Sequence, residues 1–330
     1  MSDRMRIAHV YPHAVRALPG QPAVRRLLPE ATIGLHVHDH ALADFSPAWG
    51  RTCLHAVDFA VTCSDFVTER MRRRLGGGLP PIHTLHNGVD PRFFACDAQP
   101  GESRRIVFVG RLAPEKGVHL LIEAFSRVAP RFPDATLDLI GPSDISPPEF
   151  VDPRHEDPVL VPLGPWLARP GTYRKELQRR AAGLGGRIRF LGPVDNARLP
   201  ALLRGAGLLA MPSLWHEPFG IPVVEAMAAG LPVVASDAGA FPETVLPERT
   251  GLLVPRGDGE ALAGTLARLL ADGELRKRLG AAGRARAAEC FTWQGRVETL
   301  ETIYGEALEL RARETGGATG RRGSLAASSG

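Results

Sequence analysis

Between positions 104 and 289 the sequence alternates strictly between short apolar runs and segments with helical periodicity. The apolar runs are continuous rather than alternating with polar residues, so they predict buried strands of a parallel sheet. In the helical segments apolar residues recur every three or four positions. Strand and helix in rotation indicate a doubly wound α/β domain. The predicted strands are 106–109, 137–140, 188–191, 208–211, 233–235 and 252–254, and the predicted helices are 117–128, 196–204, 222–229, 259–270 and 274–289.

The chain has 330 residues, a length that suits two domains. A smaller α/β unit is predicted before the regular part, with a turn at 87–90 and a polar link at 97–103 between the two. The proline-rich stretch 143–171 shows no period, so we expect a long surface insertion. In the first unit we predict strands at 6–11, 33–37, 59–62 and 82–85 and a helix at 66–75 that begins at Ser64 as N-cap.

These patterns define the expected domains. We expect a small amino-terminal domain at 1–94 and a larger, ligand-binding domain at 104–291. A helix at 292–310 is long enough to cross from the second domain back to the first. The Gly/Ser/Ala-rich end predicts a disordered tail at 311–330.

The loop after the predicted strand at 106–109 is the first candidate site, because doubly wound sheets bind ligands at the carboxyl ends of their strands. It begins with Gly110 and carries Arg111 and Lys116 just before a helix. A helix N-terminus carries about half a positive charge, and arginine can grip two phosphate oxygens at once. The loop therefore predicts a diphosphate site, although a solvated loop with two cations fits the same pattern.

The loop after the predicted strand at 208–211 is the second candidate site. It carries Glu217 and Gly220 and leads into a short helix that holds Glu225. Gly220 permits close approach of a ligand, and the free amides at a helix start bind oxygens. Because carboxylates accept hydrogen bonds from hydroxyls, two acids beside free amides suit a polyhydroxylated ligand that carries phosphate. For Glu225 the alternative is that it merely complements the helix dipole.

Three histidines, His36, His38 and His40, occupy alternate positions of one segment. On a strand they would face one way, so a zinc site of a metal-dependent hydrolase is one interpretation. The second cluster of His, Asp and Glu that such an enzyme needs is not evident, and the four cysteines lack metal-type spacing. A single histidine that lines a ligand site is the favoured interpretation.

These segments, with their spacing, resemble the retaining glycosyltransferases of family 4, which have the GT-B fold. The resemblance covers residues 104–308, and its most specific feature is the pair of Glu217 and Glu225, separated by seven residues. The turn at 87–90 matches the seam between the two domains of this family, and His38 resembles its active-site histidine, with His36 and His40 as alternatives. Matching segments are 109–112 with 115–117, 190–192, 212–213, 217–220, 225–230, 232–236 and 251–254.

The resemblance implies an α/β enzyme with two Rossmann-like domains that face each other across a cleft. Arg111 and Lys116 would neutralise the diphosphate of a nucleoside diphosphate sugar, for example a UDP or GDP sugar. Glu225 would bind the ribose, Glu217 would hold the sugar, and His38 would face that sugar. The implied donor contacts further include Gly110, the backbone amides of Phe219, Gly220 and Ile221 beside the sugar, and Gly192 and Val194 beside the base.

The resemblance also implies the reaction: transfer of a hexosyl group to an acceptor hydroxyl with retention of configuration, by front-side attack with the leaving phosphate as base. Negative charge develops on the departing diphosphate, where Arg111 and Lys116 would stabilise it. The sequence contains no Asp-x-Asp pair, so we expect no metal ion and no other cofactor. Closure of the cleft would exclude water and suppress hydrolysis.

Composition narrows the expected partners. The 40 basic residues outnumber the 36 acidic ones, which favours anionic ligands. We expect a nucleotide-sugar donor and a hydroxyl-bearing acceptor (a small molecule, glycan or glycolipid), and no nucleic acid. No apolar run approaches the about 20 residues of a spanning helix, and no signal peptide is visible, so we expect a cytoplasmic protein. Contact with the inner membrane face is an option through Arg70, Arg72, Arg73 and Arg74, although such a run is more often a solvated helix face.

The expected amino-terminal domain is shorter than is usual in this family. The glycine pair that the family has after its first strand is not clear here, and 18–21 stand near that place. The short domain favours an alternative function, a nucleotide-binding scaffold or partner-dependent transferase subunit with a reduced acceptor domain. A further alternative, independent of the domain's length, is the metal-dependent hydrolase built on the three histidines.

Overall fold

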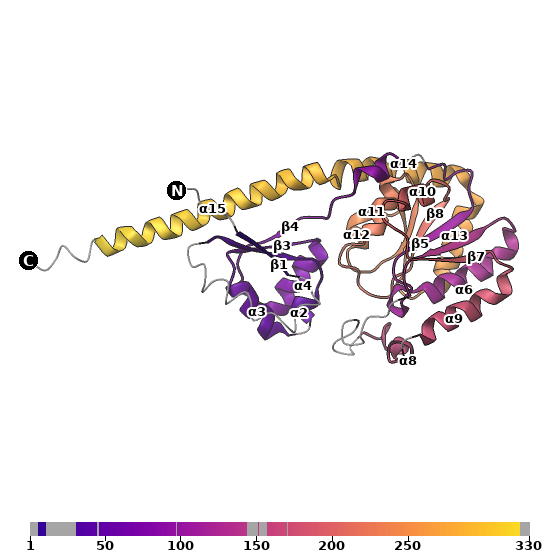
Figure 1. The fold of residues 1–330 in the computed structure, drawn as a ribbon, viewed down its shortest axis with the longest axis horizontal. Helices are drawn as coiled ribbons and strands as arrows, with labels where there is room; N and C mark the ends of the chain where they lie inside the picture. The colour runs from indigo at the N-terminus through magenta and orange to yellow at the C-terminus, as the bar shows by residue number, and fades with distance from the viewer. Residues whose placement is uncertain are drawn as a thin grey trace, which may run out of the picture. The chain divides into compact units, whose positions relative to one another are not determined.

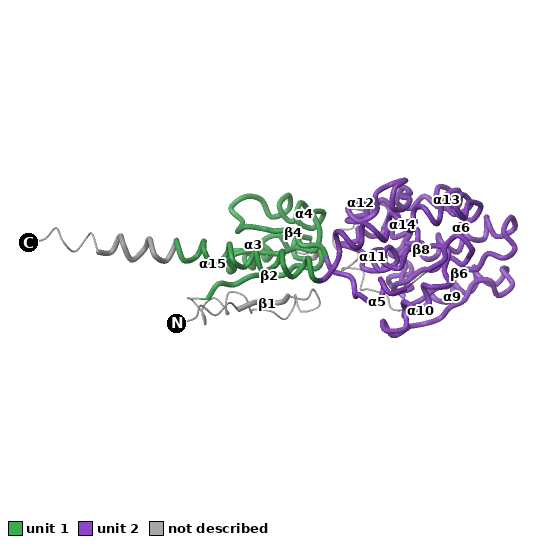
Figure 2. The backbone as a smooth tube through the Cα atoms, turned by 90° about the horizontal axis from the view of Figure 1, so that it is seen from above, with its two compact units in different colours: residues 1–86, 294–330 green, residues 87–293 purple. Residues whose placement is uncertain are grey.

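A computed structural model describes residues 6–10, 31–44, 46–96, 98–143, 151, 157–169 and 171–323 of the chain. The chain divides into two compact units, one of residues 1–86 with 294–330 and one of residues 87–293 (Figure 2). The segment 18–21 lies outside the described residues. Each unit has its own parallel sheet and is considered by itself.

The second unit is built on a six-stranded parallel sheet with the order β10-β9-β8-β5-β6-β7. Figure 1 labels β5, β7 and β8 of this sheet among its covering helices. The chain begins at β5 in the middle, adds β6 and β7 on one side, and then returns to the other side. This reversal places β5 beside β8 and creates a topological switch point, where such sheets bind ligands. The strands are β5 (Arg105–Val109), β6 (Thr136–Ile140), β7 (Ile188–Gly192), β8 (Leu208–Met211), β9 (Val233–Ser236) and β10 (Gly251–Val254).

Helices between these strands bury the sheet, and β8 and β9 are buried along their whole length, as their continuous apolar runs predict. α6 packs with α9 and α13, and α11 packs with α14. The five predicted helices are confirmed with small shifts of their ends, as α6 (Val118–Val128), α10 (Leu199–Arg204), α11 (Ile221–Ala228), α13 (Gly259–Ala271) and α14 (Gly273–Cys290). The structure adds helices that were not predicted: η2 (Pro114–Lys116), α9 (Thr172–Ala181) and the short α5 (Pro91–Phe94), α8 (Gly164–Leu167) and α12 (Phe241–Thr244).

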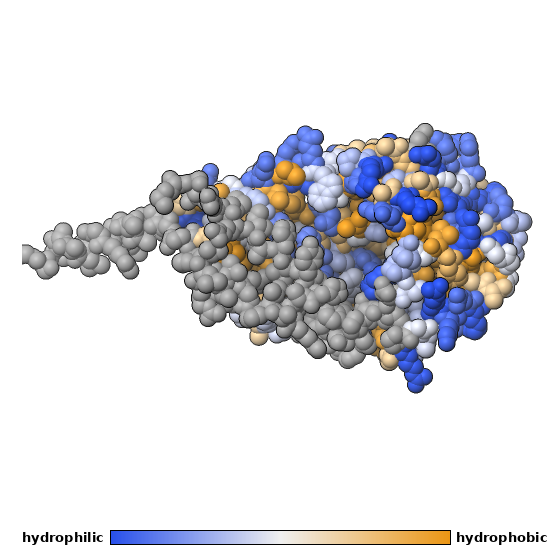
Figure 3. Space-filling view, in the orientation of Figure 1, coloured by the Kyte–Doolittle hydropathy of each residue, from blue (hydrophilic) through white to orange (hydrophobic). Residues whose placement is uncertain are grey.

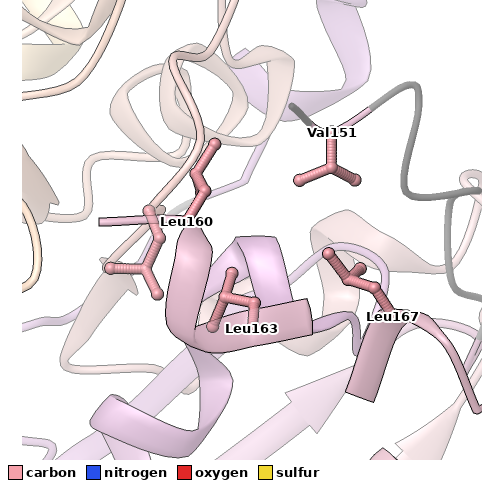
Figure 4. Packing of buried hydrophobic residues seen from close by; sticks show 5 residues of the cluster. Val151, Leu160, Leu163 and Leu167 are labelled. Atoms are coloured by element: carbon pink, nitrogen blue, oxygen red, sulfur yellow. The ribbon is translucent and has the colours of Figure 1, made fainter. Parts of the chain in front are cut away.

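The stretch 143–171 differs from the expected surface insertion, because its described part contains a small hydrophobic core. Its aliphatic residues pack against Leu214, in the loop that follows β8 (Figure 4). Asp157 anchors the stretch by accepting hydrogen bonds from the two terminal nitrogens of Arg256 at 2.6 and 2.8 Å. The aliphatic residues of this stretch lie between prolines at irregular spacing, so hydrophobic periodicity did not predict that they are buried. The buried members are Val151, Leu160, Leu163, Leu167 and Leu214.

The first unit contains a four-stranded parallel sheet in the order β1-β2-β3-β4. Ser64 caps α4 as predicted, since its Oγ accepts a hydrogen bond from the backbone N–H of Val67 at 3.2 Å. The elements are β1 (Arg6–Val10), β2 (Ile33–Val37), α2 (Ala41–Asp44), α3 (Pro47–His55), β3 (Phe59–Thr62), α4 (Asp65–Leu75) and β4 (Ile82–Thr84).

The last helix, α15 (Trp293–Gly323), begins where the second unit ends and packs in the first unit. Ile303 and Ala307 are buried with Phe59 and Val61 of β3. The helix does not end at 310 as expected but continues to Gly323, so 311–323 is helical rather than a disordered tail. Pairing of Arg313 with Glu309 one turn earlier and of Arg311 with Asp58 favours this extension, and 324–330 lie outside the described residues.

The visible surface is mixed in polarity. Hydrophilic residues dominate the outer surface of the second unit in Figure 3, with hydrophobic residues scattered among them. Among the described helices none is both long enough and apolar enough to cross a membrane.

Candidate functional site

The two predicted site loops lie side by side at the switch point of the second unit. The carbonyl oxygen of Glu115, in the loop after β5, accepts the backbone N–H groups of Leu214 and Trp215, in the loop after β8, at 2.8 and 3.0 Å. Gly117 makes this approach possible. Its φ is +69°, and a Cβ at this position would lie 1.9 Å from the carbonyl oxygen of Pro212.

Lys116 and Glu217 meet across these loops although they are 101 positions apart in the chain. The ammonium Nζ donates to Glu217 Oε1 at 2.7 Å and lies 4.8 Å from the ring centroid of Trp215. The same oxygen accepts a hydrogen bond from Ser213 Oγ at 2.7 Å. Glu217 is only 5% exposed, so the pair is shielded from water and its mutual attraction is strong. The structure therefore brings the predicted cation Lys116 and the predicted acid Glu217 into direct contact.

Arg111 is paired within its own loop. Its Nη2 donates to Oε1 of Glu115 at 2.8 Å, while a third of the arginine side chain remains exposed. Glu115 is 1% exposed, and its second oxygen, Oε2, is buried without a hydrogen-bond partner among the described residues. A guanidinium has five donors, so Arg111 can keep this acid and still face a further anion.

Glu225 is a buried acid in α11. The helix begins at Ile221, so Glu225 is its fifth residue rather than part of the first turn, and the helix-dipole explanation loses its force there. Burial, and secondly the negative charge of Asp90, raises the pKa of Glu225 to about 7. No donor in the described part of the chain bonds its carboxylate. A buried carboxylate without an internal partner suits a ligand hydroxyl.

The start of α11 presents the predicted backbone amides. Gly220 is its N-cap with φ +89°, and a Cβ there would lie 2.3 Å from the ring of Phe241. The first N–H groups of a helix have no acceptor within the helix, which leaves those of the Gly220–Ile221 segment for other acceptors. The ring of Phe219 packs edge-on against Phe291 at 5.8 Å, so only its backbone can serve a ligand.

The ends of β5, β6 and β7 form a continuous glycine-lined edge. The N–H of Gly110 donates to the carbonyl of Ile140 at 2.9 Å, and the N–H of Gly141 donates to the carbonyl of Gly192 at 2.8 Å. A Cβ on Gly141 would lie 1.9 Å from the carbonyl oxygen of Gly110. Of the residues predicted to border the nucleotide base, Gly192 ends β7, the strand two places from β5, and the half-buried Val194 lies in the loop after it.

The three histidines of the first unit do not form one cluster: the ring centroids of His36 and His38 lie 6.3 Å apart, whereas His40 packs against Asp44 and the ring of Phe66. β2 ends before His38, so only His36 lies on the strand. His36 is buried with its Nε2 3.0 Å from the hydroxyl of Tyr304, and His40 is buried with its Nδ1 2.6 Å from a carboxylate oxygen of Asp44. No group of three possible metal ligands among the residues described contains any of them. His38 is the exposed one, at the carboxyl end of β2.

The arginines of α4 are partly matched inside the first unit. Arg70 donates to both carboxylate oxygens of Asp44 at 3.0 and 2.9 Å, and Arg72 pairs with Glu69 at 2.8 Å. Contact of this helix with lipid stays a prediction, and the exposed arginines Arg72 and Arg73 would carry the charge for it.

Glu115 and Ser213 lie in segments that match the family, but no role was predicted for them, although they hold the charged groups of the site. Glu115 stands four positions after Arg111, the spacing at which side chains on a helical turn meet. Ser213 stands two positions after the end of a predicted strand, where ligand loops begin. These two positions can be read from the sequence. What identifies the residues as part of the site is their burial, which only the structure shows.

Comparison with known proteins assigns a family. The family described as "Glycosyl transferases group 1" matches residues 91–286, more than half of the chain. The chain belongs to this family. The matched region contains both loops of the candidate site, from Gly110 to Glu225.

Curated relatives support the assignment. The chain is 35% identical over 248 residues to a D-inositol 3-phosphate glycosyltransferase of Corynebacterium glutamicum, a match that covers 74% of this chain and 48% of the relative. It is 35% identical over 221 residues to a phosphatidyl-myo-inositol mannosyltransferase of Mycolicibacterium smegmatis, with 66% and 49% covered. The chain thus spans about half the length of these relatives.

Solved structures of glycosyltransferases share the fold. Sucrose-phosphate synthase from Thermosynechococcus elongatus matches with a TM-score of 0.71 and 24% identity, over 92% of this chain and 74% of that one. Alr3699/HepE of Anabaena, in complex with UDP and glucose, matches with a TM-score of 0.71 and 22% identity, over 91% and 78%. The chain has the GT-B fold of two Rossmann-like units, as expected from the sequence.

Proposed function

We propose that this chain transfers a sugar from a nucleoside diphosphate sugar to an acceptor hydroxyl, with retention of anomeric configuration and without a metal ion. The observation that carries the proposal is the 2.7 Å contact of Lys116 with Glu217 at the switch point. It places a cation suited to a leaving diphosphate beside an acid suited to sugar hydroxyls. The family supports the reaction class, and the UDP bound to the HepE structures supports the donor class.

In the proposed reaction the bond between the anomeric carbon and a phosphate oxygen breaks. The acceptor oxygen bonds to the same face of the sugar, and its proton passes to the departing diphosphate. Arg111 and Lys116 stabilise the negative charge on that diphosphate. Glu225 accepts hydrogen bonds from the ribose, and Glu217 accepts them from the sugar. Two relatives carry inositol in the names of their activities, which supports a hydroxyl-rich acceptor.

A nucleotide-binding scaffold, or a subunit that needs a partner for transfer, is the second candidate. It is favoured by the modest first unit, whose described sheet has four strands against six in the second. It predicts nucleotide binding with neither sugar transfer nor slow hydrolysis of the donor. Detection of either activity in the purified chain excludes it.

The donor site is tested by two substitutions, Lys116→Ala and Glu225→Gln. Because each removes a charged hydrogen-bonding group, each is expected to weaken binding of the preferred nucleoside diphosphate by about tenfold to a hundredfold. Isothermal titration against UDP, GDP and ADP measures this. The matched controls are Lys175→Ala and Glu289→Gln, which change exposed residues of the same unit. Unchanged affinity in both test variants would rule out the proposed donor site.

A further inference from the structure

The two cations of the candidate site are held by acids of different character. Arg111 is held by Glu115 of its own loop, and Lys116 is held by Glu217 of the neighbouring loop. Glu115 is held in place by its side chain and by its backbone. The side chain is 1% exposed, and the backbone carbonyl oxygen accepts hydrogen bonds from the loop after β8. Glu217 is also buried, but it comes from the other loop, and its partner Lys116 is a cation that would have to turn to the diphosphate.

A diphosphate cannot simply add to this arrangement at Lys116. The Lys116 side chain is 12% exposed, and its ammonium already faces one carboxylate oxygen and the ring of Trp215. A phosphate oxygen at the ammonium would bring a second negative charge next to Glu217 in a shielded place, where like charges repel strongly. At Arg111 the repulsion is weaker, because a third of its side chain is exposed to water and its five donors can serve Glu115 and a phosphate on separate sides.

We propose that Glu217 exchanges partners when the donor binds: its carboxylate releases Lys116 to the diphosphate and takes up hydroxyls of the transferred sugar. This inference rests on the proposed function. Ser213 Oγ, which donates to the same carboxylate oxygen at 2.7 Å, keeps Glu217 anchored during the exchange. Glu217 is thus a specificity-determining residue that links phosphate binding to the presence of a sugar.

The exchange explains how the site distinguishes donor from product. An intact nucleotide sugar replaces the lost ammonium with hydroxyl donors. A free nucleoside diphosphate carries no sugar hydroxyls, so it leaves the buried carboxylate with Ser213 and an adjacent phosphate charge. A buried charged group without its partner is costly, so the product binds more weakly than it would without Glu217.

The test compares Glu217→Gln with Glu115→Gln, two matched changes of a buried acid that holds a cation of the β5 loop. Dissociation constants for UDP, UDP-glucose, GDP and GDP-mannose are measured by isothermal titration. Glu217→Gln is expected to bind the free nucleoside diphosphate about tenfold more tightly than the wild type and to lose preference for the sugar-bearing form. Glu115→Gln is expected to weaken binding of both forms, because Arg111 loses its support.

Opposite effects of the two variants on the free diphosphate would establish the exchange. If Glu217→Gln and the second variant Glu217→Ala both bind it no more tightly than the wild type, while their thermal unfolding remains cooperative, the exchange is overturned. Failure of the proposed function itself would give a different set of binding results. In that case the wild type would bind none of the four nucleotides, or Lys116→Ala would bind them as well as the wild type, and the exchange would fall with it.

Discussion

Glu225 is the residue whose ionisation depends most clearly on the folded structure of the site. Burial, followed by the charge of Asp90, raises its pKa from 4.5 to about 7. The folded chain therefore holds a proton that the unfolded chain has lost between these two values. Because the native state binds more protons there, the contribution of this group to stability falls as pH rises through that window.

This dependence predicts a difference between the wild type and Glu225→Gln. Relative to the variant, the wild type is expected to lose about 3 kcal/mol of unfolding free energy between pH 4.5 and 7, at about 1.4 kcal/mol per pKa unit. Urea denaturation of both proteins across that range measures the difference. Parallel pH profiles would show that the carboxyl of Glu225 titrates in the fold as it does in the unfolded chain.

At the scale of elements, the contact between the loops after β5 and β8 depends on Gly117. An alanine at this position needs a left-handed backbone and would place its Cβ 1.9 Å from a carbonyl oxygen of the other loop. Gly117→Ala is expected to cost about 2 kcal/mol or more and to weaken UDP binding by about tenfold, because the loops must separate. Thermal unfolding and titration with UDP measure the two effects.

Gly185→Ala is the matched control for Gly117→Ala. Gly185 has φ +58°, and nothing lies within 4 Å of a Cβ built on it. Its replacement should cost about 1 kcal/mol from backbone strain alone and leave UDP binding unchanged. Equal effects of the two variants on UDP binding would contradict the importance of the loop contact.

Which elements could be predicted depends on how local their causes are. The strands of the second unit were predictable because continuous apolar runs reflect burial on both faces, as in β8 and β9. The stretch 143–171 was not, because Leu160 and Leu163 are buried by Leu214, a residue far away in the sequence. The zinc interpretation of the three histidines, which was the less favoured one, depended on where a strand ends: β2 stops before His38, so the alternation does not continue to His40.

The candidate site shows the same division. Its two loops could be found from the sequence because a doubly wound sheet places its ligand loops by topology alone. The side-chain pairs within these loops could not be predicted, because no sequence pattern indicates that Lys116 contacts Glu217 or that Arg111 contacts Glu115. Pairings between loops depend on close approaches such as that of Gly117 to Pro212, which no local pattern encodes.

At the scale of the whole molecule, the proposed diphosphate and ribose contacts belong to one unit. Arg111, Lys116 and Glu225 all lie in residues 87–293, whereas α15 packs on the sheet of the first unit through Ile303. Ligand binding stabilises the structure that carries the site, and core truncation destabilises the structure that holds the core. The two perturbations should therefore act on different units.

Calorimetry of the full chain tests this separation. Saturation with the preferred nucleoside diphosphate at about 100 times its dissociation constant should stabilise the second unit by about 2.7 kcal/mol and raise one unfolding transition. Ile303→Ala removes most of a side chain that is only 6% exposed from the core of the first unit. It should destabilise that unit by about 2–4 kcal/mol and lower the other transition. The expected result is two transitions that move independently. If Ile303→Ala instead lowers the transition that the nucleotide raises, the units unfold as one and α15 supports the site-bearing unit as well.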